Sequence, residues 1–415
     1  MKIKAVKAIE VLDSRGKPTI RTFITLIDDS IHSATVPSGA SIGSHEALEL
    51  RDNNPKYHLG AGVKKAVENV NTILAKTIIG MTVKKPDIID KKMIEIDGTP
   101  DKSQLGANAI LSVSMAVARA AAYTKKQPLW KFLNRFYFQG TKPTLPRIMF
   151  NVVNGGKHAN WNFDIQEFII MPRTNKPSLA CQIGAEIYQT IAKLLKEKKL
   201  SVLVGDEGGF SPALNSNEEA FQLIAQAGEL AGYNNDQDYQ LGIDAAASEF
   251  FSKDKYILKK DSREISGKDL LSYYLTLKGK YKIYSFEDVF AEDDWKHFSK
   301  FMFENLSALP SLVIGDDLFC TDIKRMKIGQ EENAANAIII KPNQIGTILE
   351  TVAAIKLARE YNWKVIVSHR SGETEDTFIA DLAYGSAADF LKNGAPCRSE
   401  RTAKYNRLIE IENGY

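Results

Sequence analysis

The chain has 415 residues, of which 44% are hydrophobic and 25% charged, so it can bury large cores and is longer than one ordinary domain. Its net charge of +3 excludes a nucleic-acid or membrane partner that is bound through bulk charge. The first residues lack the unbroken apolar run of a signal peptide or a membrane span, so we expect a cytoplasmic protein with no membrane and no direct nucleic-acid partner.

Residues 1–133 have the pattern of an α+β domain. Apolar and polar residues alternate from residue 3 to residue 27 around a turn at residues 13–18, which predicts an antiparallel sheet. In residues 62–78, Val63, Val70 and Leu74 recur at helical spacing, so one helix face should pack on that sheet. The Ala-rich stretch 106–122 is apolar nearly all round, which indicates a helix buried on several sides.

Residues 143–415 repeat short β-rich runs that are followed by helix-length segments, which is typical of a parallel barrel. Most runs are too continuously apolar for a sheet with one wet face. We therefore expect an α/β protein, in which the N-terminal α+β domain precedes a (β/α)8 barrel that carries the active site. The runs expected to form strands are IQEFIIMP, SVLVGDEGG, YQLGIDAAAS, KIYSFED, SLVIGDD, AIIIKPNQ and KVIVSHRSG.

Charged residues follow the later apolar runs, namely Asp244, Glu287, Asp316, Lys341 and His369. The C-terminal ends of parallel barrel strands meet at one mouth, so these side chains should form a ring there. A single acidic residue after a strand is more often a helix cap or a solvated loop residue than a metal ligand. For the five residues as a group, the alternative to a metal site is a set of separate salt bridges. Lys341 alone cannot neutralise three acids, although Lys392 could contribute. A bound cation is therefore favoured, and a donor set of oxygens favours Mg2+.

Lys341 is a candidate general base in this ring. We expect a lysine beside a bound cation to have a lowered pKa, because the neighbouring positive charge and burial both disfavour the ammonium form. Its task would be to remove a weakly acidic proton next to a carboxylate, which needs metal charge to hold the enediolate.

Gly-rich loops supply the other candidates. Glu207 in GDEGG and Glu167 in QEF are a carboxylate pair that could hold a proton for a leaving hydroxide, although Glu167 is as readily a strand residue paired with a basic neighbour. Arg370 and Ser371 are candidate phosphate-binding residues, because a guanidinium and a hydroxyl can both donate hydrogen bonds to phosphate. His158 lies in the polar loop NGGKHAN, where substrate contact is a reasonable interpretation.

Motifs along nearly the whole chain, in order, resemble the enolase family. SHRSGETEDTFIADLA is highly specific, whereas DSRG or GDD alone would not be. The resemblance implies an enolase-type barrel whose first helix and second strand run opposite to the usual sense. The matching motifs are VLDSRGKPT, VPSGASIGSHEALELRD, NGGKHAN with QEF, VGDEGGFSP, FED with AEDDW, GDD, IKPNQIGT, VSHRSGETEDTFIADLA and GAPCRSER.

The resemblance implies a carbon-oxygen hydro-lyase that reversibly dehydrates 2-phospho-D-glycerate to phosphoenolpyruvate in glycolysis and gluconeogenesis. It implies two Mg2+ ions per active site, the first held by Asp244, Glu287 and Asp316 and the second by Ser41. Lys341 would be the base, and Glu207, aided by Glu167, would be the acid. The residues implied to contact the substrate are His158, Glu167, Glu287, Asp316, His369, Arg370, Ser371 and Lys392.

The resemblance also implies a homo-oligomer, either a dimer or an octamer of dimers, and the sequence leaves that choice open. It allows a surface or secreted pool, as in similar enolases, beside the cytoplasmic one. Lys17, Ile42 and Val289 stand where the family usually has Asn, Thr and Pro. None of these removes a proposed ligand, but Ile42 adjoins Ser41, so we expect altered loop closure and second-metal affinity there.

Two alternatives remain open. Another acid-sugar dehydratase of the same superfamily would share the metal triad but need a different anion seat, and HRSGETED and GAPCRSER argue against it. An assembly or adhesion protein would keep the fold without turnover. Formation of an ultraviolet-absorbing product from 2-phosphoglycerate distinguishes the enzyme from both.

Overall fold

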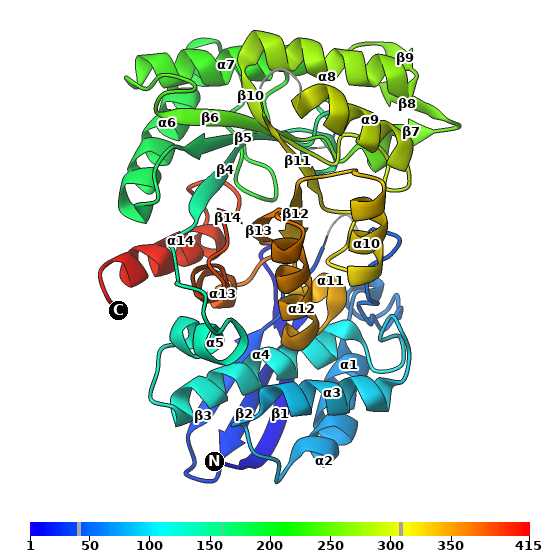
Figure 1. The fold of residues 1–415 in the computed structure, drawn as a ribbon, viewed down its shortest axis with the longest axis vertical. Helices are drawn as coiled ribbons and strands as arrows, with labels where there is room; N and C mark the ends of the chain where they lie inside the picture. The colour runs from blue at the N-terminus through cyan, green and yellow to red at the C-terminus, as the bar shows by residue number, and fades with distance from the viewer. Residues whose placement is uncertain (40–42, 160, 307–309) are drawn as a thin grey trace.

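The computed structural model describes residues 1–39, 43–159, 161–306 and 310–415 (Figure 1). The chain begins with a three-stranded antiparallel sheet of β1 (Ile3–Leu12), β2 (Pro18–Leu26) and β3 (Ile31–Thr35), which confirms the expected sheet. The β1–β2 turn is held by Asp13, whose Oδ1 accepts hydrogen bonds from the backbone N–H groups of Arg15 (2.8 Å) and Lys17 (2.9 Å). Such bonds from an Asp side chain to its own turn are a common turn device.

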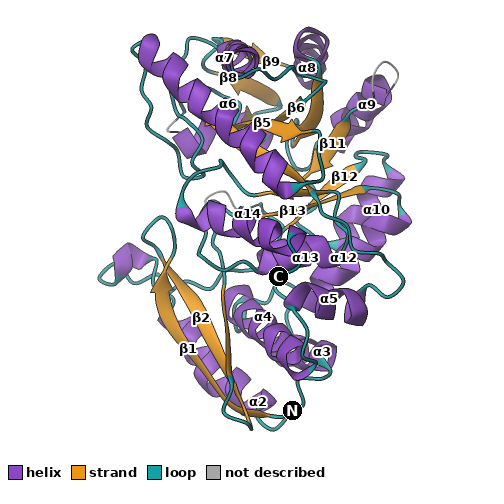
Figure 2. Ribbon diagram, turned by 90° about the vertical axis from the view of Figure 1, so that its left-hand side faces the viewer, coloured by secondary structure: helices purple, strands orange, loops and turns teal. Residues whose placement is uncertain are grey.

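Helices cover one face of this sheet. The segment expected as one helix is continuous but changes type, from α1 (Lys64–Asn69) through the π-helical turn η2 (Val70–Leu74) to α2 (Ala75–Ile78), and α3 (Pro86–Asp97) follows. α4 (Ala107–Thr124) is the expected Ala-rich helix and is buried along nearly its whole length. In Figure 2, β1 and β2 lie on one side of α4 and α3 lies on the other. α5 (Leu129–Tyr137) ends this part of the chain.

A closed barrel of eight strands follows, in the spatial order β10-β11-β12-β13-β14-β4-β5-β6. β5 pairs antiparallel with both of its neighbours, whereas the other pairs are parallel, so the reversed second strand implied by the resemblance is present. The strands are β4 (Arg147–Asn154), β5 (Glu167–Pro172), β6 (Tyr239–Asp244), β10 (Ile283–Glu287), β11 (Leu312–Gly315), β12 (Ala337–Ile340), β13 (Lys364–Ser368) and β14 (Phe390–Lys392).

Helices surround the barrel (Figure 1). The side chains of its strands are nearly all buried, as expected for a sheet that is covered on both faces. The helices are α6 (Pro177–Glu197), α7 (Asn217–Leu230), α8 (Gly267–Tyr281), α9 (Trp295–Leu306), α10 (Ile323–Glu331), α11 (Pro342–Ile345), α12 (Ile348–Glu360), α13 (Phe378–Gly385) and α14 (Ser399–Glu412). A small sheet of β7 (Phe251–Ser252), β8 (Lys255–Leu258) and β9 (Arg263–Ile265) is inserted after β6. None of the helices in the described ranges combines the length and apolar character needed to span a membrane.

One expected strand is wrong, and two strands of the barrel were missed. The run SVLVGDEGG forms a loop, and Leu203 within it is 76% exposed. The loop is nevertheless fixed to the end of β4, because the N–H of Phe210 donates to the Val152 carbonyl (2.9 Å) and the N–H of Asn154 donates to the Phe210 carbonyl (2.8 Å). β4 and β14 take the places in the barrel that the prediction left unassigned, and β14 has only 3 residues, too few to give a readable pattern.

The N-terminal helices pack against helices on the barrel: α5 contacts α13, α4 contacts α11, and α3 contacts α12. Polar contacts cross the same boundary. Ser114 accepts a hydrogen bond from the Ile348 N–H (3.0 Å), and Arg119 forms an ion pair with Asp376 (2.6 Å). The β1–β2 turn also reaches the barrel, since the Ser14 N–H donates to the Glu373 carbonyl (2.7 Å). The N-terminal domain thereby supports the loop that follows β13.

Candidate active site

The charged residues expected at the barrel mouth do lie at strand ends. Asp244 and Glu287 are the last residues of the neighbouring strands β6 and β10, and their backbones are in register with each other. Lys341 directly follows β12, and His369 directly follows β13. Because these strands are parallel, their C-terminal ends open toward the same mouth, and the side chains come together there.

Glu167 reaches the same mouth from the opposite end of its strand. It is the first residue of β5, and β5 runs antiparallel to its neighbours, so the start of β5 lies beside the ends of β4 and β6. In the register of these strands, Glu167 is paired with Asn154 on one side and with Asp244 on the other. The reversed strand therefore adds a carboxylate that an all-parallel barrel would place at the far end.

A cavity of about 20 Å³ lies between these side chains. This is little more than the space of one water molecule, because the charged groups pair closely with one another. A substrate must therefore separate existing ion pairs as it enters. The cavity is lined by Gln166, Glu167, Glu207, Asp244, Asp316, Lys341, Ser368, His369, Arg370, Ser371 and Lys392.

Lys392 is the cation that holds three of the acids together. It is the last residue of β14, and its Nζ lies 3.0 Å from Asp244 Oδ2 and 2.8 Å from Glu287 Oε1. Its Nζ is also 3.0 Å from Glu167 Oε2, an ion pair without the angle of a hydrogen bond. All of these groups are buried, so their mutual attraction is poorly screened by solvent.

Asp244, Glu287 and Asp316 form a group that fits a hard divalent cation. One carboxylate oxygen of each lies within 4.8 Å of the others, and all three residues are buried. Burial and then repulsion by Asp244 raise the pKa of Glu287 well above its ordinary value. Glu287 Oε2 is buried and has no hydrogen-bond partner among the described residues. An all-oxygen donor set with an unused buried oxygen fits a hard divalent cation.

Asp316 also belongs to a second acidic group, with Asp288 and Asp317. Here the carboxylate of Asp288 already has backbone partners, since its Oδ1 accepts from the Asp316 N–H (2.9 Å) and its Oδ2 accepts from the Asp317 N–H (2.7 Å). These bonds fix the turn after β11. The carboxylate of Asp288 therefore holds the backbone of Asp316 in place.

Lys341 forms an ion pair with Asp316, and both side chains are largely buried. Burial lowers the pKa of Lys341, but the Asp316 carboxylate opposes it, and the net pKa lies above the ordinary value for lysine. The pKa of Lys341 is thus raised while Asp316 faces its ammonium group, and the lowering expected beside a bound cation stays a prediction. The sequence could not reveal that Asp316 would point its carboxylate directly at the ammonium group.

Arg370 is held by a carboxylate that the prediction did not include. Its Nη1 lies 2.8 Å from Glu46 Oε2 and its Nη2 lies 3.1 Å from Glu46 Oε1, a bidentate pair whose side chains are 3% and 5% exposed. Glu46 Oε1 also accepts from the Gly43 N–H (3.1 Å). The guanidinium thus faces an anionic group already, and the segment that carries this anion comes from the N-terminal domain.

Glu207 has two polar neighbours at one of its carboxylate oxygens, Asn151 and His369. Asn151 Nδ2 donates to Glu207 Oε2 (3.0 Å), and His369 Nε2 lies 3.5 Å from the same oxygen. Glu167 is close enough to Glu207 to be affected by its charge: burial first, and then repulsion by Glu207, raise the pKa of Glu167 well above its ordinary value. A raised carboxyl pKa next to a second carboxylate is the arrangement of a pair that shares a proton.

His369 is buried and neutral at physiological pH. Burial is the main cause that lowers the pKa of His369 from 6.5 to about 4. The Glu207 charge acts in the opposite direction and raises this pKa, whereas the Arg401 charge lowers it further. The unfolded chain takes up a proton as the pH falls below 6.5, whereas the folded protein does not until near pH 4. Stability from this group is therefore lost as the pH falls through this window, by up to about 3 kcal/mol.

We predict that the free energy of unfolding, measured with urea at about pH 7 and about pH 4.5, falls less between these pH values in His369→Gln than in the wild type. The comparison isolates His369, because other titrating groups are common to both proteins. An equal fall in the two proteins would show that His369 is not held neutral by the fold.

Two of the predicted residues cannot be placed fully. Ser41, like its neighbour Ile42, lies outside the described residues, as does the side chain of His158, whose backbone belongs to the short helix η3 (Gly156–Ala159). Val289, where the family usually has Pro, is fully buried after β10, and Lys17 is exposed in the β1–β2 turn.

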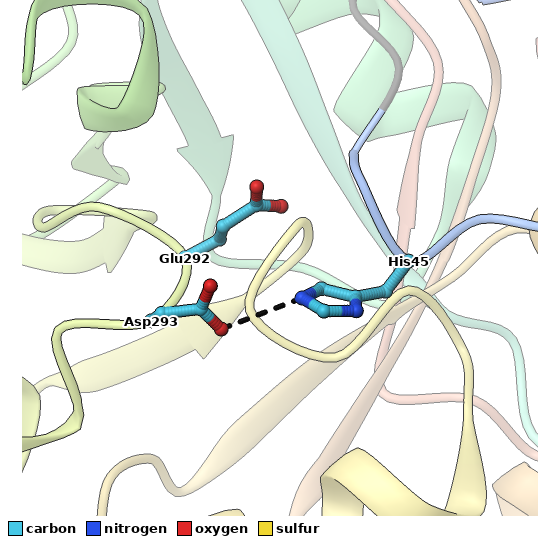
Figure 3. A group of neighbouring side chains, drawn as sticks. All are labelled: His45, Glu292 and Asp293. Carbon is cyan, nitrogen blue, oxygen red and sulfur yellow. Dashed lines mark ion pairs between the residues drawn. The ribbon is translucent and has the colours of Figure 1, made fainter.

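A further group of potential ligands, His45, Glu292 and Asp293, lies at the outer edge of the mouth (Figure 3). His45 Nε2 points toward Asp293 Oδ1 (3.4 Å), which also pairs with Arg325 (3.0 Å). The carboxylate of Glu292 accepts two hydrogen bonds from Ser44, one from its hydroxyl (2.8 Å) and one from its backbone N–H (3.2 Å). These contacts tie the segment that carries Glu46 to the loop after β10.

Glu46, Asn151 and Arg401 are among the residues of this site that sequence reasoning missed. Glu46 and Arg401 stand inside motifs that carried the resemblance, but their partners are more than 30 residues away in the chain, so spacing gave no signal. Asn151 lies in β4, a strand that was not assigned. Only the folded arrangement shows what each of them contacts.

Comparison with known families agrees with this geometry. Residues 3–133 match the family model described as "Enolase, N-terminal domain". Residues 142–415 match the one described as "Enolase, C-terminal TIM barrel domain". The chain therefore belongs to the enolase family, as a lyase-type enzyme of the enolase superfamily.

Proposed function

We propose that the protein is a phosphopyruvate hydratase, which reversibly dehydrates 2-phospho-D-glycerate to phosphoenolpyruvate in glycolysis and gluconeogenesis. One observation carries the proposal. Two members of a buried carboxylate triad, Asp244 and Asp316, line one cavity together with Lys341 and the carboxylate pair Glu167 and Glu207. These are the groups needed to remove a proton next to a carboxylate and to protonate a leaving hydroxyl.

Asp244, Glu287 and Asp316 would hold one Mg2+ ion, and Ser41 would bind a second. A divalent cation at the triad would supply positive charge that engages Asp316 and stabilises negative charge on the substrate carboxylate. Lys392 keeps Asp244 and Glu287 close together despite their repulsion. The chain thereby prearranges the ligands before any ion arrives.

Lys341 would remove the proton on the carbon next to the substrate carboxylate. It must first lose its proton, and the Asp316 carboxylate opposes this loss. Lys341 is therefore competent as a base when the negative charge of Asp316 is engaged by another cation. Proton removal thus depends on occupation of the triad.

Glu207 would protonate the leaving hydroxyl, with Glu167 as its partner. The raised pKa of Glu167, caused by burial and by the Glu207 charge, supports a proton shared by the two carboxyl groups. Asn151 and His369 approach Glu207 on one oxygen, Oε2.

Arg370 and Ser371 would bind the substrate phosphate. A phosphate group accepts the parallel N–H donors of a guanidinium as a carboxylate does, so it would compete with Glu46 for Arg370. The Gly43–Glu46 segment would shift as that competition is resolved. Substrate binding is thereby linked to movement of the N-terminal domain segment over the mouth.

This competition predicts the behaviour of Glu46→Gln. The change removes the Glu46 charge that faces the buried Arg370 guanidinium, so it should lower the free energy of unfolding by about 3–5 kcal/mol. Inorganic phosphate should restore stability, raising the Tm of the variant by more than that of the wild type. Thermal unfolding with and without phosphate measures both effects. Glu49→Gln is the control, since it breaks a half-buried pair with Arg51 outside the cavity and should respond to phosphate as the wild type does.

The proposed function is tested by following phosphoenolpyruvate absorbance after the protein is mixed with 2-phosphoglycerate and Mg2+. We expect product to form, to stop on addition of a chelator and to resume when Mg2+ is restored. Absence of product under these conditions would contradict the proposal.

A further inference from the structure

We propose that Arg401 is a positioning residue that fixes the tautomer of His369, so that the imidazole presents an Nε2–H donor to Glu207. The inference rests on the proposed role of Glu207 as the acid. Arg401 lies on α14 and is fully buried, and it does not line the cavity. It acts on the reaction only through the groups that it holds.

The tautomer follows from the chemistry of one contact. Arg401 Nη1 lies 2.6 Å from His369 Nδ1. A guanidinium carries only donors and stays protonated in proteins, so it must donate in this contact. His369 Nδ1 must therefore be the acceptor, and the single proton of the neutral ring must lie on Nε2.

The Nε2 proton faces the proposed acid. His369 Nε2 lies 3.5 Å from Glu207 Oε2, the oxygen that also accepts from Asn151 Nδ2. The Nε2–H group of His369 and the amide group of Asn151 thus both face Glu207 Oε2 as donors. His369 therefore orients the Glu207 carboxyl and cannot take a proton from it through Nε2, so the proton for the leaving hydroxyl stays on the Glu207–Glu167 pair.

Arg401 also fixes the backbone on both sides of this contact. Its guanidinium donates to the carbonyls of Arg370 (2.6 Å) and Ser371 (2.7 Å) in the loop after β13, and to the carbonyl of Asp206 (3.0 Å) next to Glu207. One buried side chain thus joins the loop that carries the proposed phosphate seat to the loop that carries the proposed acid. The orientation of His369 relative to Glu207 depends on both loops.

The ring nitrogens of His369 can be observed directly by 15N NMR of histidine-labelled protein, and His369→Asn assigns the signal among the 6 histidines. In the wild type near neutral pH, we expect protonated Nε2 and unprotonated Nδ1. Arg401→Gln replaces an obligate donor by an amide that can also accept, so both tautomers should appear. Arg401→Lys keeps a donor-only group and should keep the wild-type tautomer.

A matched control and a kinetic readout separate positioning from general support of the fold. Arg407→Gln lies on the same helix and breaks a two-bond contact with Asp381, away from the cavity, so it should leave the His369 signals unchanged. Arg401→Gln should slow dehydration by about 10- to 100-fold, the range found when groups that orient active-site residues are removed. Exchange of the substrate α-proton should be retained.

A wild-type His369 with protonated Nδ1 would overturn the inference even if Arg401→Gln fails to fold. A folded Arg401→Gln with the wild-type tautomer and full dehydration rate would also overturn it. The NMR measurement needs no turnover. A wild type that shows the expected tautomer but makes no phosphoenolpyruvate would therefore contradict the proposed function and leave the assignment of the tautomer intact.

Discussion

Lys341→Ala is expected to abolish exchange of the α-proton of 2-phosphoglycerate with solvent and, as a result, dehydration. Lys341 is the basic side chain that directly follows β12 and lines the cavity, where it pairs with Asp316. Removing a general base costs about 100- to 10,000-fold in rate. Proton NMR in deuterated water measures the exchange, and product absorbance measures dehydration.

The control for this variant is Lys102→Ala. Lys102 is also a buried lysine in a close ion pair, with Glu350 (3.0 Å), but it lies outside the cavity. Its loss should lower stability and leave both rates near those of the wild type. If Lys341→Ala still exchanged the α-proton at the wild-type rate, the base would have to be another group.

Glu207→Gln is expected to lose dehydration but to retain exchange of the α-proton. The amide cannot protonate a leaving hydroxyl, so dehydration should fall by about 100- to 10,000-fold. The α-proton should still exchange, because Lys341 and the carboxylate triad are unchanged. The same two measurements, on one sample, give both rates.

Glu350→Gln is the matched control, because it makes the same chemical change in the ion pair with Lys102 and should affect neither rate. Equal loss of exchange and dehydration in Glu207→Gln would contradict the assignment of separate base and acid. So would dehydration at the wild-type rate.

The sequence predicted the fold class well, because its signals are local. The alternation in β1 and β2 and the apolar runs of β6, β10, β11, β12 and β13 are each visible within a few residues. The run at residues 201–209 has the same composition but lies on the surface, where Leu203 is exposed. Its partner, the end of β4, is about 50 residues away, and composition does not reveal such pairing.

The sequence predicted which candidate residues lie at the ends of strands. It did not predict which residues far apart in the chain form pairs. Asp244, Glu287 and Lys341 follow from one rule about parallel barrels. The pairing of Glu46 with Arg370 joins residues 324 apart, and its carboxylate comes from another domain. Likewise the sequence does not show that Asp316 faces Lys341 and raises the pKa of its ammonium group, because that contact depends on the folded arrangement.

The most direct test compares two substrates with one preparation of the protein and Mg2+: 2-phosphoglycerate and D-gluconate, an acid sugar that lacks phosphate. We predict that 2-phosphoglycerate is dehydrated to phosphoenolpyruvate and that the acid sugar is not, because Arg370 and Ser371, which line the cavity, are proposed to bind the substrate phosphate. Dehydration of the acid sugar without any turnover of 2-phosphoglycerate would contradict the proposed function and place the protein among the other dehydratases of the superfamily.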